Sequence, residues 1–152
     1  MKAFTSICCL AMIASTGVFQ AGSKPDDPRA EATLELKDIA PPPGSIVNQT
    51  MVIAATLEYS INEFKSRGFF ATVMFETRSP NTTMGAPGSP FPEERLIRKA
   101  SGTVTVRQPL GPIWRDSNLA RPFKVWFYLH QRQPGGQSVV IAEIGPIEYK
   151  VQ

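Results

Sequence analysis

The strongest constraint on the fold is where the prolines lie. All 14 prolines fall outside the runs in which apolar and polar residues alternate. Proline cannot donate a hydrogen bond to a sheet ladder, so this placement is typical of β-strands separated by turns. No segment shows the apolar spacing of a convincing amphipathic helix. The sequence therefore predicts an all-β fold.

The clearest half-buried strand runs from Met51 to Ile61. Every odd-numbered residue in it is apolar, whereas Thr56, Glu58 and Ser60 fall on the opposite face. The segment from Phe69 to Thr77 begins with apolar residues on both faces, which is typical of a central strand. Shorter strands are expected at 34–36, 96–97, 102–107, 138–144 and 147–151.

The segment from Phe123 to Leu129 alternates strictly, with its odd-numbered residues expected to point inward. Trp126, Tyr128 and His130 are expected on the outward face. The glycine-rich turn that follows predicts a hairpin with the next strand. Gly145-Pro146 interrupts the last strand and predicts an edge strand that bulges or changes sheet.

About seven short strands separated by turns form the pattern of a β-sandwich with Greek-key connections. The segment from Pro43 to Thr50 leads into the longest alternating strand, and the chain closes with a hairpin and a broken last strand. In these features the chain from Thr33 to Val151 resembles the immunoglobulin-like and fibronectin-type-III-like domains of secreted proteins, often bacterial. The resemblance implies an immunoglobulin-like β-sandwich of about seven antiparallel strands. It also implies a binding, adhesion or spacer role, and no active site carries over.

The N-terminal segment has the three parts of a secretory signal peptide. Lys2 gives a positive start, residues 4–14 are uncharged and mainly apolar, and the small residues 15–17 offer a cleavage site, with Ala21 as a second possible end. The second half of the uncharged run from Ala3 to Ser23 is too polar for a transmembrane helix. We therefore expect a secreted or periplasmic protein without a stable membrane anchor. The expected division of the chain is a signal peptide (1–21), a disordered leader (22–31) and a single β-sandwich domain (32–152).

Both cysteines, Cys8 and Cys9, lie inside the expected signal peptide. The mature chain is therefore expected to have no disulfide, thiol chemistry or cysteine-ligated metal, and it lacks the Cys–Trp–Cys pattern of antibody domains. Loss of Lys2 with the signal lowers the net charge of +3 by one, and so weak a charge does not argue for nucleic acid. We expect no cofactor and no nucleic-acid partner.

No residue pattern indicates catalysis. His130 is the one histidine and is expected to be an exposed surface residue, because a catalytic triad or zinc site needs partners that the sequence does not mark. Glu93-Glu94 is the one adjacent glutamate pair, and we interpret it as a solvated edge beside Arg95 and Arg98. An enzyme built on this carboxylate pair is the least favoured of three functions. We predict that the chain is not an enzyme.

Aromatic residues are the better candidates for partner binding. Trp126 and Tyr128 share the outward face of one strand, where they could stack on sugars or on peptide side chains. The alternative is that another layer covers them, or that they simply favour β structure. Trp114 and Arg115 lie in a loop and belong to residue types enriched at interface hot spots. For Trp114, however, closing the end of the core is the more favoured interpretation.

The irregular segment from Arg78 to Glu94 is longer than a usual connection and is either functional or decorative. Asn48 and Asn81 begin N-glycosylation patterns, which matter only if a eukaryote secretes the chain. The leading hypothesis is a secreted or periplasmic, non-enzymatic binding or structural module that docks an unknown protein or glycan. The alternative is a secreted inhibitor or accessory factor that acts through the 78–94 loop.

Overall fold

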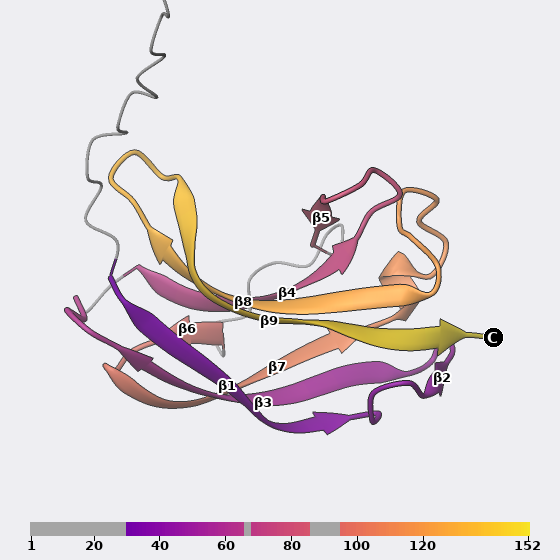
Figure 1. Ribbon diagram of the computed structural model, residues 1–152, viewed down its shortest axis with the longest axis horizontal. Helices are drawn as coiled ribbons and strands as arrows, with labels where there is room; N and C mark the ends of the chain where they lie inside the picture. The colour runs from indigo at the N-terminus through magenta and orange to yellow at the C-terminus, as the bar shows by residue number, and fades with distance from the viewer. Residues whose placement is uncertain (1–29, 66–67, 86–94) are drawn as a thin grey trace, which may run out of the picture.

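The computed structural model describes residues 30–65, 68–85 and 95–152. These residues form two β-sheets that lie face to face (Figure 1), and they contain no α-helix, which confirms the all-β prediction. In the same part of the chain, no helix is long and apolar enough to cross a membrane. The expected signal peptide, most of the expected leader and the Glu93-Glu94 pair lie outside the described residues.

The smaller sheet has three antiparallel strands in the order β1-β3-β7. Its strands are β1 (Ala32–Ala40), β3 (Val52–Ile61) and β7 (Ser101–Pro109). The odd-numbered residues of β3 are buried as predicted, but Met51 precedes the strand and is exposed. β7 continues past its predicted end to Pro109, which is tolerated because β7 is the last strand in this sheet order.

The larger sheet follows the order β2-β9-β8-β4-β5, and β6 also pairs with β4. Its strands are β2 (Ile46–Val47), β4 (Phe69–Glu76), β5 (Thr83–Met84), β6 (Leu96–Ile97), β8 (Phe123–Arg132) and β9 (Ser138–Val151). A 3-10 turn, η2 (Gly111–Ile113), lies between β7 and β8. The described residues thus form six long strands and three two-residue strands, where the sequence predicted about seven.

The prediction that all strands are antiparallel is wrong at one place, because β2 pairs with β9 in parallel. After β1 the chain leaves the smaller sheet and joins the edge of the larger one. Gly44 N donates to Glu148 O over 2.8 Å, and Lys150 N donates to Ser45 O over 3.0 Å. These bonds fasten the crossing segment to the last strand, so the early part of the chain ties the two sheets together.

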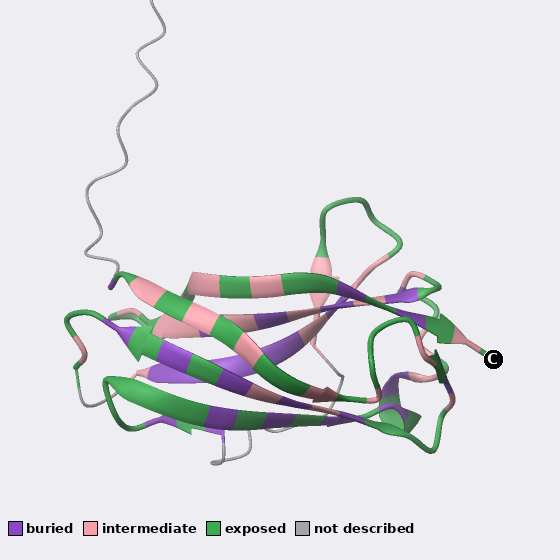
Figure 2. Cartoon of the chain, turned by 60° about the horizontal axis from the view of Figure 1, so that its bottom comes forward, coloured by how far each residue is buried: buried purple, intermediate pink, exposed green. Residues whose placement is uncertain are grey.

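The core lies between the sheets, and Figure 2 shows the alternation of buried and more exposed residues along the strands. In β8 the odd-numbered residues from Phe123 to Leu129 are buried, as predicted. β4 is buried on both faces from Phe69 to Val73, which agrees with its predicted central place. Each fully buried Phe, Leu or Val contributes about 1.5–3 kcal/mol relative to an exposed side chain. Packing between these two sheets is therefore the main source of stability.

The last strand, β9, is continuous but irregular. Val125 pairs with Ile147 and Phe127 pairs with Ile144, so Gly145 and Pro146 together face Trp126. Two residues opposite one is the arrangement of a β-bulge. The predicted interruption at Gly145-Pro146 is therefore a bulge within the strand.

Candidate functional site

Outward-pointing side chains gather on the face of the larger sheet that is turned away from the core. Trp126 and Tyr128 are half-buried on β8, two residues apart on the same face. In the neighbouring strand β4, Met74 pairs with Trp126 and Thr72 pairs with Tyr128. Alternate residues of a strand share a face and lie about 7 Å apart. The structure therefore brings the two predicted aromatic residues together on one surface.

A depression of about 210 Å³ opens beside these two rings. Its lining comes from the end of β4, the loop to β5, β5 itself, β8 and β9. The lining residues are Glu76, Asn81, Thr82, Thr83, Trp126, Tyr128 and Glu143. Two aromatic plates are thus combined with carboxylate, amide and hydroxyl groups, which can accept and donate hydrogen bonds.

Trp126 rests directly on the backbone of the bulge in β9. A Cβ atom at Gly145 would lie 2.9 Å from Trp126 Cδ1 and 3.0 Å from Trp126 Cγ. Gly145 also has a φ of +142°, a conformation that residues with side chains rarely adopt. Glycine is required at this position for both reasons, and its absent side chain leaves room for the indole ring.

The loop between β4 and β5 is closed by short hydrogen bonds. Thr77 N donates to Thr82 O over 2.9 Å, and the hydroxyl groups of these two threonines are also hydrogen-bonded. Thr82 Oγ1 donates to Ser79 O over 2.7 Å. Asn81 has a φ of +58°, which asparagine tolerates better than most residues. The loop thereby holds Asn81 and Thr82 at the rim of the depression.

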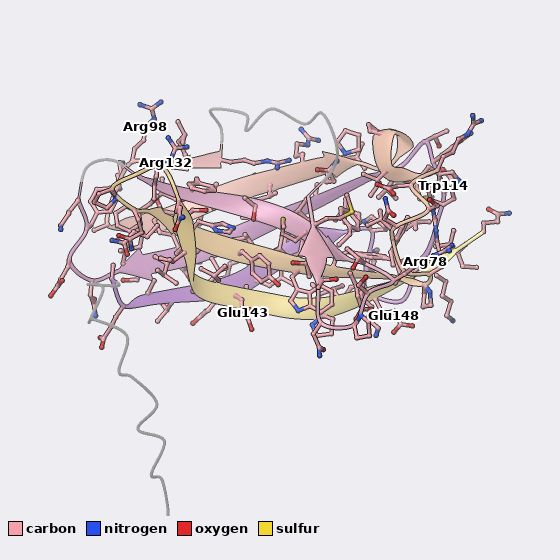
Figure 3. The ribbon with its side chains drawn as sticks, turned by 90° about the horizontal axis from the view of Figure 1, so that it is seen from above. Arg78, Arg98, Trp114, Arg132, Glu143 and Glu148 are labelled. Atoms are coloured by element: carbon pink, nitrogen blue, oxygen red, sulfur yellow. The ribbon has the colours of Figure 1, made fainter. Side chains whose placement is uncertain are left out.

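The two carboxylates of the lining differ in their partners. Glu76 forms an ion pair with Lys124, with 3.1 Å between Oε2 and Nζ. Glu143 is exposed, pairs in register with Tyr128 and forms no ion pair with any residue that the structure describes. Figure 3 shows Glu143 along β9, with Glu148 further along the same strand. The lining therefore carries one uncompensated negative charge.

His130 is not the exposed residue that the sequence predicted. Its Nε2 atom lies 2.8 Å from Thr72 Oγ1, and its ring stacks on Phe70 with 4.8 Å between the centroids. It also meets Tyr128 edge-on at 5.9 Å. Burial lowers the pKa of His130 below its ordinary value of 6.5. The alternating pattern of β8 correctly predicts that His130 lies on the outward face of the sheet. It cannot reveal that Phe70 and Thr72 of β4 cover the ring.

The other two predicted contact residues, Trp114 and Arg115, lie apart from this site. Trp114 packs against the core, with its ring edge-to-face to Phe123 at 5.8 Å. The guanidinium of Arg121 donates to the Trp114 carbonyl oxygen and lies over the indole ring, 5.2 Å from its centroid. Arg115 is exposed. Trp114 thus closes one end of the core, well away from Glu143 (Figure 3).

The sequence did not mark Glu76 or Glu143 as site residues, and it marked Asn81, Thr82 and Thr83 as candidate contacts only as part of the 78–94 loop. Among the described residues, no group of three or more potential ligand side chains is placed to hold a metal ion. Comparison of the chain with protein-family models, with curated proteins and with solved structures finds no match. Any inference about function therefore starts from the geometry of the site itself.

Proposed function

We propose that the chain is a secreted or periplasmic, non-enzymatic binding module that docks a partner through the outer face of β4, β8 and β9. We also propose that its fold is of the immunoglobulin-like class. In immunoglobulin domains, strands A, B and E share one sheet and strands C, F and G share the other. Taken in chain order, the six long strands divide in the same way, with β1, β3 and β7 in one sheet and β4, β8 and β9 in the other.

The observation that carries the docking proposal is the placement of Trp126 and Tyr128. Both rings stay partly exposed beside a polar depression, whereas Phe123 and Phe127 of the same strand are buried in the core. Trp and Tyr combine a large apolar surface with a polar atom, so they suit surfaces that are wet when free and covered when bound. Such residues are enriched among those that dominate binding energy.

One observation also favours a part for the 78–94 loop. Asn81, Thr82 and Thr83, from the described part of this segment, line the same depression as the two aromatic rings. An inhibitor or accessory factor acting through this loop would therefore use the same face. This alternative differs from the leading proposal in what the partner is, not in where it docks.

Affinity capture tests the proposal. Residues 22–152 are immobilised and exposed to envelope and extracellular material from the host, and the bound proteins and glycans are identified by mass spectrometry. We expect the double variant Trp126→Ala/Tyr128→Ala to capture at most about one tenth of the partner that the unmodified chain captures. Thr105→Ala, an exposed change on β7 of the other sheet, serves as the control.

Two results would redirect or reject the proposal. Undiminished capture by the double variant, with folding verified by circular dichroism, would contradict docking through this face. Loss of capture on Arg115→Ala instead would move the docking surface to the loop between β7 and β8, which lies beside the end of β4. Deletion of residues 86–94 measures what that part of the loop adds to binding.

A further inference from the structure

We infer that the depression beside Trp126 and Tyr128 binds a neutral oligosaccharide. The inference rests on the proposed function, because it names the ligand class of the same face. It follows from three features: the chemical groups that line the depression, the way the aromatic rings are held, and the charge of the rim.

The groups in the lining match the two chemical faces of a sugar ring. A sugar ring presents C–H groups on its flat faces and hydroxyl groups around its rim. The C–H faces pack on aromatic plates, and the hydroxyls need acceptors and donors beside the plate. Trp126 and Tyr128 supply two plates, while Asn81, Glu76 and Glu143 supply polar groups around them. Two plates on one strand give an oligosaccharide more contact than a monosaccharide.

The aromatic rings are held in place before any ligand arrives. The indole of Trp126 lies on the backbone at Gly145, where a Cβ atom would overlap it. Tyr128 meets the ring of His130 edge-on, and His130 in turn stacks on Phe70 and is hydrogen-bonded to Thr72. Side chains that are already ordered lose little conformational entropy on binding. This support makes weak stacking contacts useful for recognition.

The charge of the lining selects against acidic ligands. Glu76 is paired with Lys124, but Glu143 has no ion-pair partner in the described part of the chain. An anionic sugar placed here would be repelled by the free carboxylate. Ionised carboxylates only accept hydrogen bonds, and neutral sugar hydroxyls can donate to them.

The polar lining of the depression favours a glycan over a folded protein. The centre of a standard protein interface is apolar. The depression of about 210 Å³ is small, and five of its seven lining residues are polar or charged. Protein docking on this face is therefore an outcome that the test must be able to reveal.

Tryptophan fluorescence provides a direct test because the chain has only two tryptophans. Trp114→Phe leaves Trp126 as the one reporter and keeps an aromatic ring against Phe123. This variant is screened on an array of neutral and acidic glycans. The best neutral oligosaccharide and an oligogalacturonate of equal length are then titrated against it.

We expect a saturable change in Trp126 emission with a neutral oligosaccharide, and none with oligogalacturonate at the same concentrations. Tyr128→Ala in the same background should weaken neutral-sugar binding about tenfold or more. Arg115→Ala should leave it unchanged, since Arg115 is exposed outside the depression. Glu143→Gln should reduce the discrimination against oligogalacturonate, because it removes the free charge but keeps the shape.

Two outcomes overturn the saccharide inference. The first is the absence of binding to any neutral glycan on the array, and the second is oligogalacturonate binding as tight as neutral binding. If the double variant Trp126→Ala/Tyr128→Ala nevertheless fails to capture the host partner that the unmodified chain binds, docking through this face stands. Only the ligand class is then wrong. If the double variant also keeps its captured partner, the proposed function fails as well.

Discussion

The hydroxyl group of Tyr149 donates a 3.0 Å hydrogen bond to the carbonyl oxygen of Pro41. The two residues are 108 positions apart, and the bond joins β9 to the connection where the chain leaves the smaller sheet. Tyr149 is fully buried, and burial raises its pKa to about 12. The phenol therefore stays protonated near neutral pH and remains a donor.

Tyr149→Phe should lower the free energy of unfolding by about 1 kcal/mol, because the Pro41 carbonyl loses its donor while the ring still fills its place. Urea denaturation gives this value directly, and its slope should not change. Tyr128→Phe is the matched control, since Tyr128 is only half-buried. Equal stability of Tyr149→Phe and the unmodified chain would show that the bond contributes nothing.

Gly145→Ala should destabilise the domain by more than about 1 kcal/mol, through backbone strain and overlap with the Val125 carbonyl oxygen and with Trp126. Gly135→Ala is a matched control because Gly135 also has a positive φ, but nothing lies within 4 Å of a Cβ atom there. In the Trp114→Phe background, only Gly145→Ala should shift the emission of Trp126. Equal destabilisation by both variants, with no shift, would contradict the proposed contact.

The stability of the fold should decrease as the pH falls below about 6.5, partly because of His130. Burial lowers the pKa of His130, so in this window the unfolded chain takes up a proton that the folded chain does not. The contribution of neutral His130 to the free energy of unfolding is complete above the pKa that this residue has in the unfolded chain. It is lost as the pH falls toward the lower pKa that His130 has in the folded chain.

His130→Gln, which keeps a polar group near Thr72, should flatten this part of the profile. Urea midpoints between about pH 7.5 and about pH 5 provide the comparison. Parallel curves for the variant and the unmodified chain would rule out His130 as the source of the pH dependence.

Arg121→Ala should lower the free energy of unfolding by about 0.5–1 kcal/mol, because the guanidinium lies over the rings of Trp114 and Phe123. The distance from Arg121 Cζ to the Phe123 centroid is 4.3 Å. Arg115→Ala should have almost no effect on the unfolding midpoint, since Arg115 is exposed. A larger effect at Arg115 than at Arg121 would show that the two arginines have been assigned the wrong roles.

The strands were predictable wherever one face of the strand is buried in the core and the other face is more exposed to solvent. β3 alternates over ten residues and β8 over its first eight, and this period identifies a strand and its inward face. β2 and β5 have two residues each, too few to show a period. The parallel pairing of β2 depends on a partner at the far end of the chain, which no local pattern reveals.

The candidate site was predictable in its aromatic residues and, more coarsely, in the 78–94 loop. Trp126 and Tyr128 follow from alternation within one strand, whereas Glu76, Asn81 and Glu143 come from three other segments. The registers of β4 and β9 against β8, together with the turn from β4 to β5, bring these segments together. The same limit explains His130, because the residues that cover it belong to β4.

The start of β1 and the end of β9 lie at opposite ends of the two sheets (Figure 1). A pull applied between these points would act along the strands, and hydrogen bonds between antiparallel strands run perpendicular to that direction. Many bonds would then bear the load in shear at once, instead of opening one after another. The pairing of β2 with the last residues of β9 adds a further clamp at the point of traction. Tension applied along the length of the domain would therefore be resisted by many strand-to-strand hydrogen bonds together.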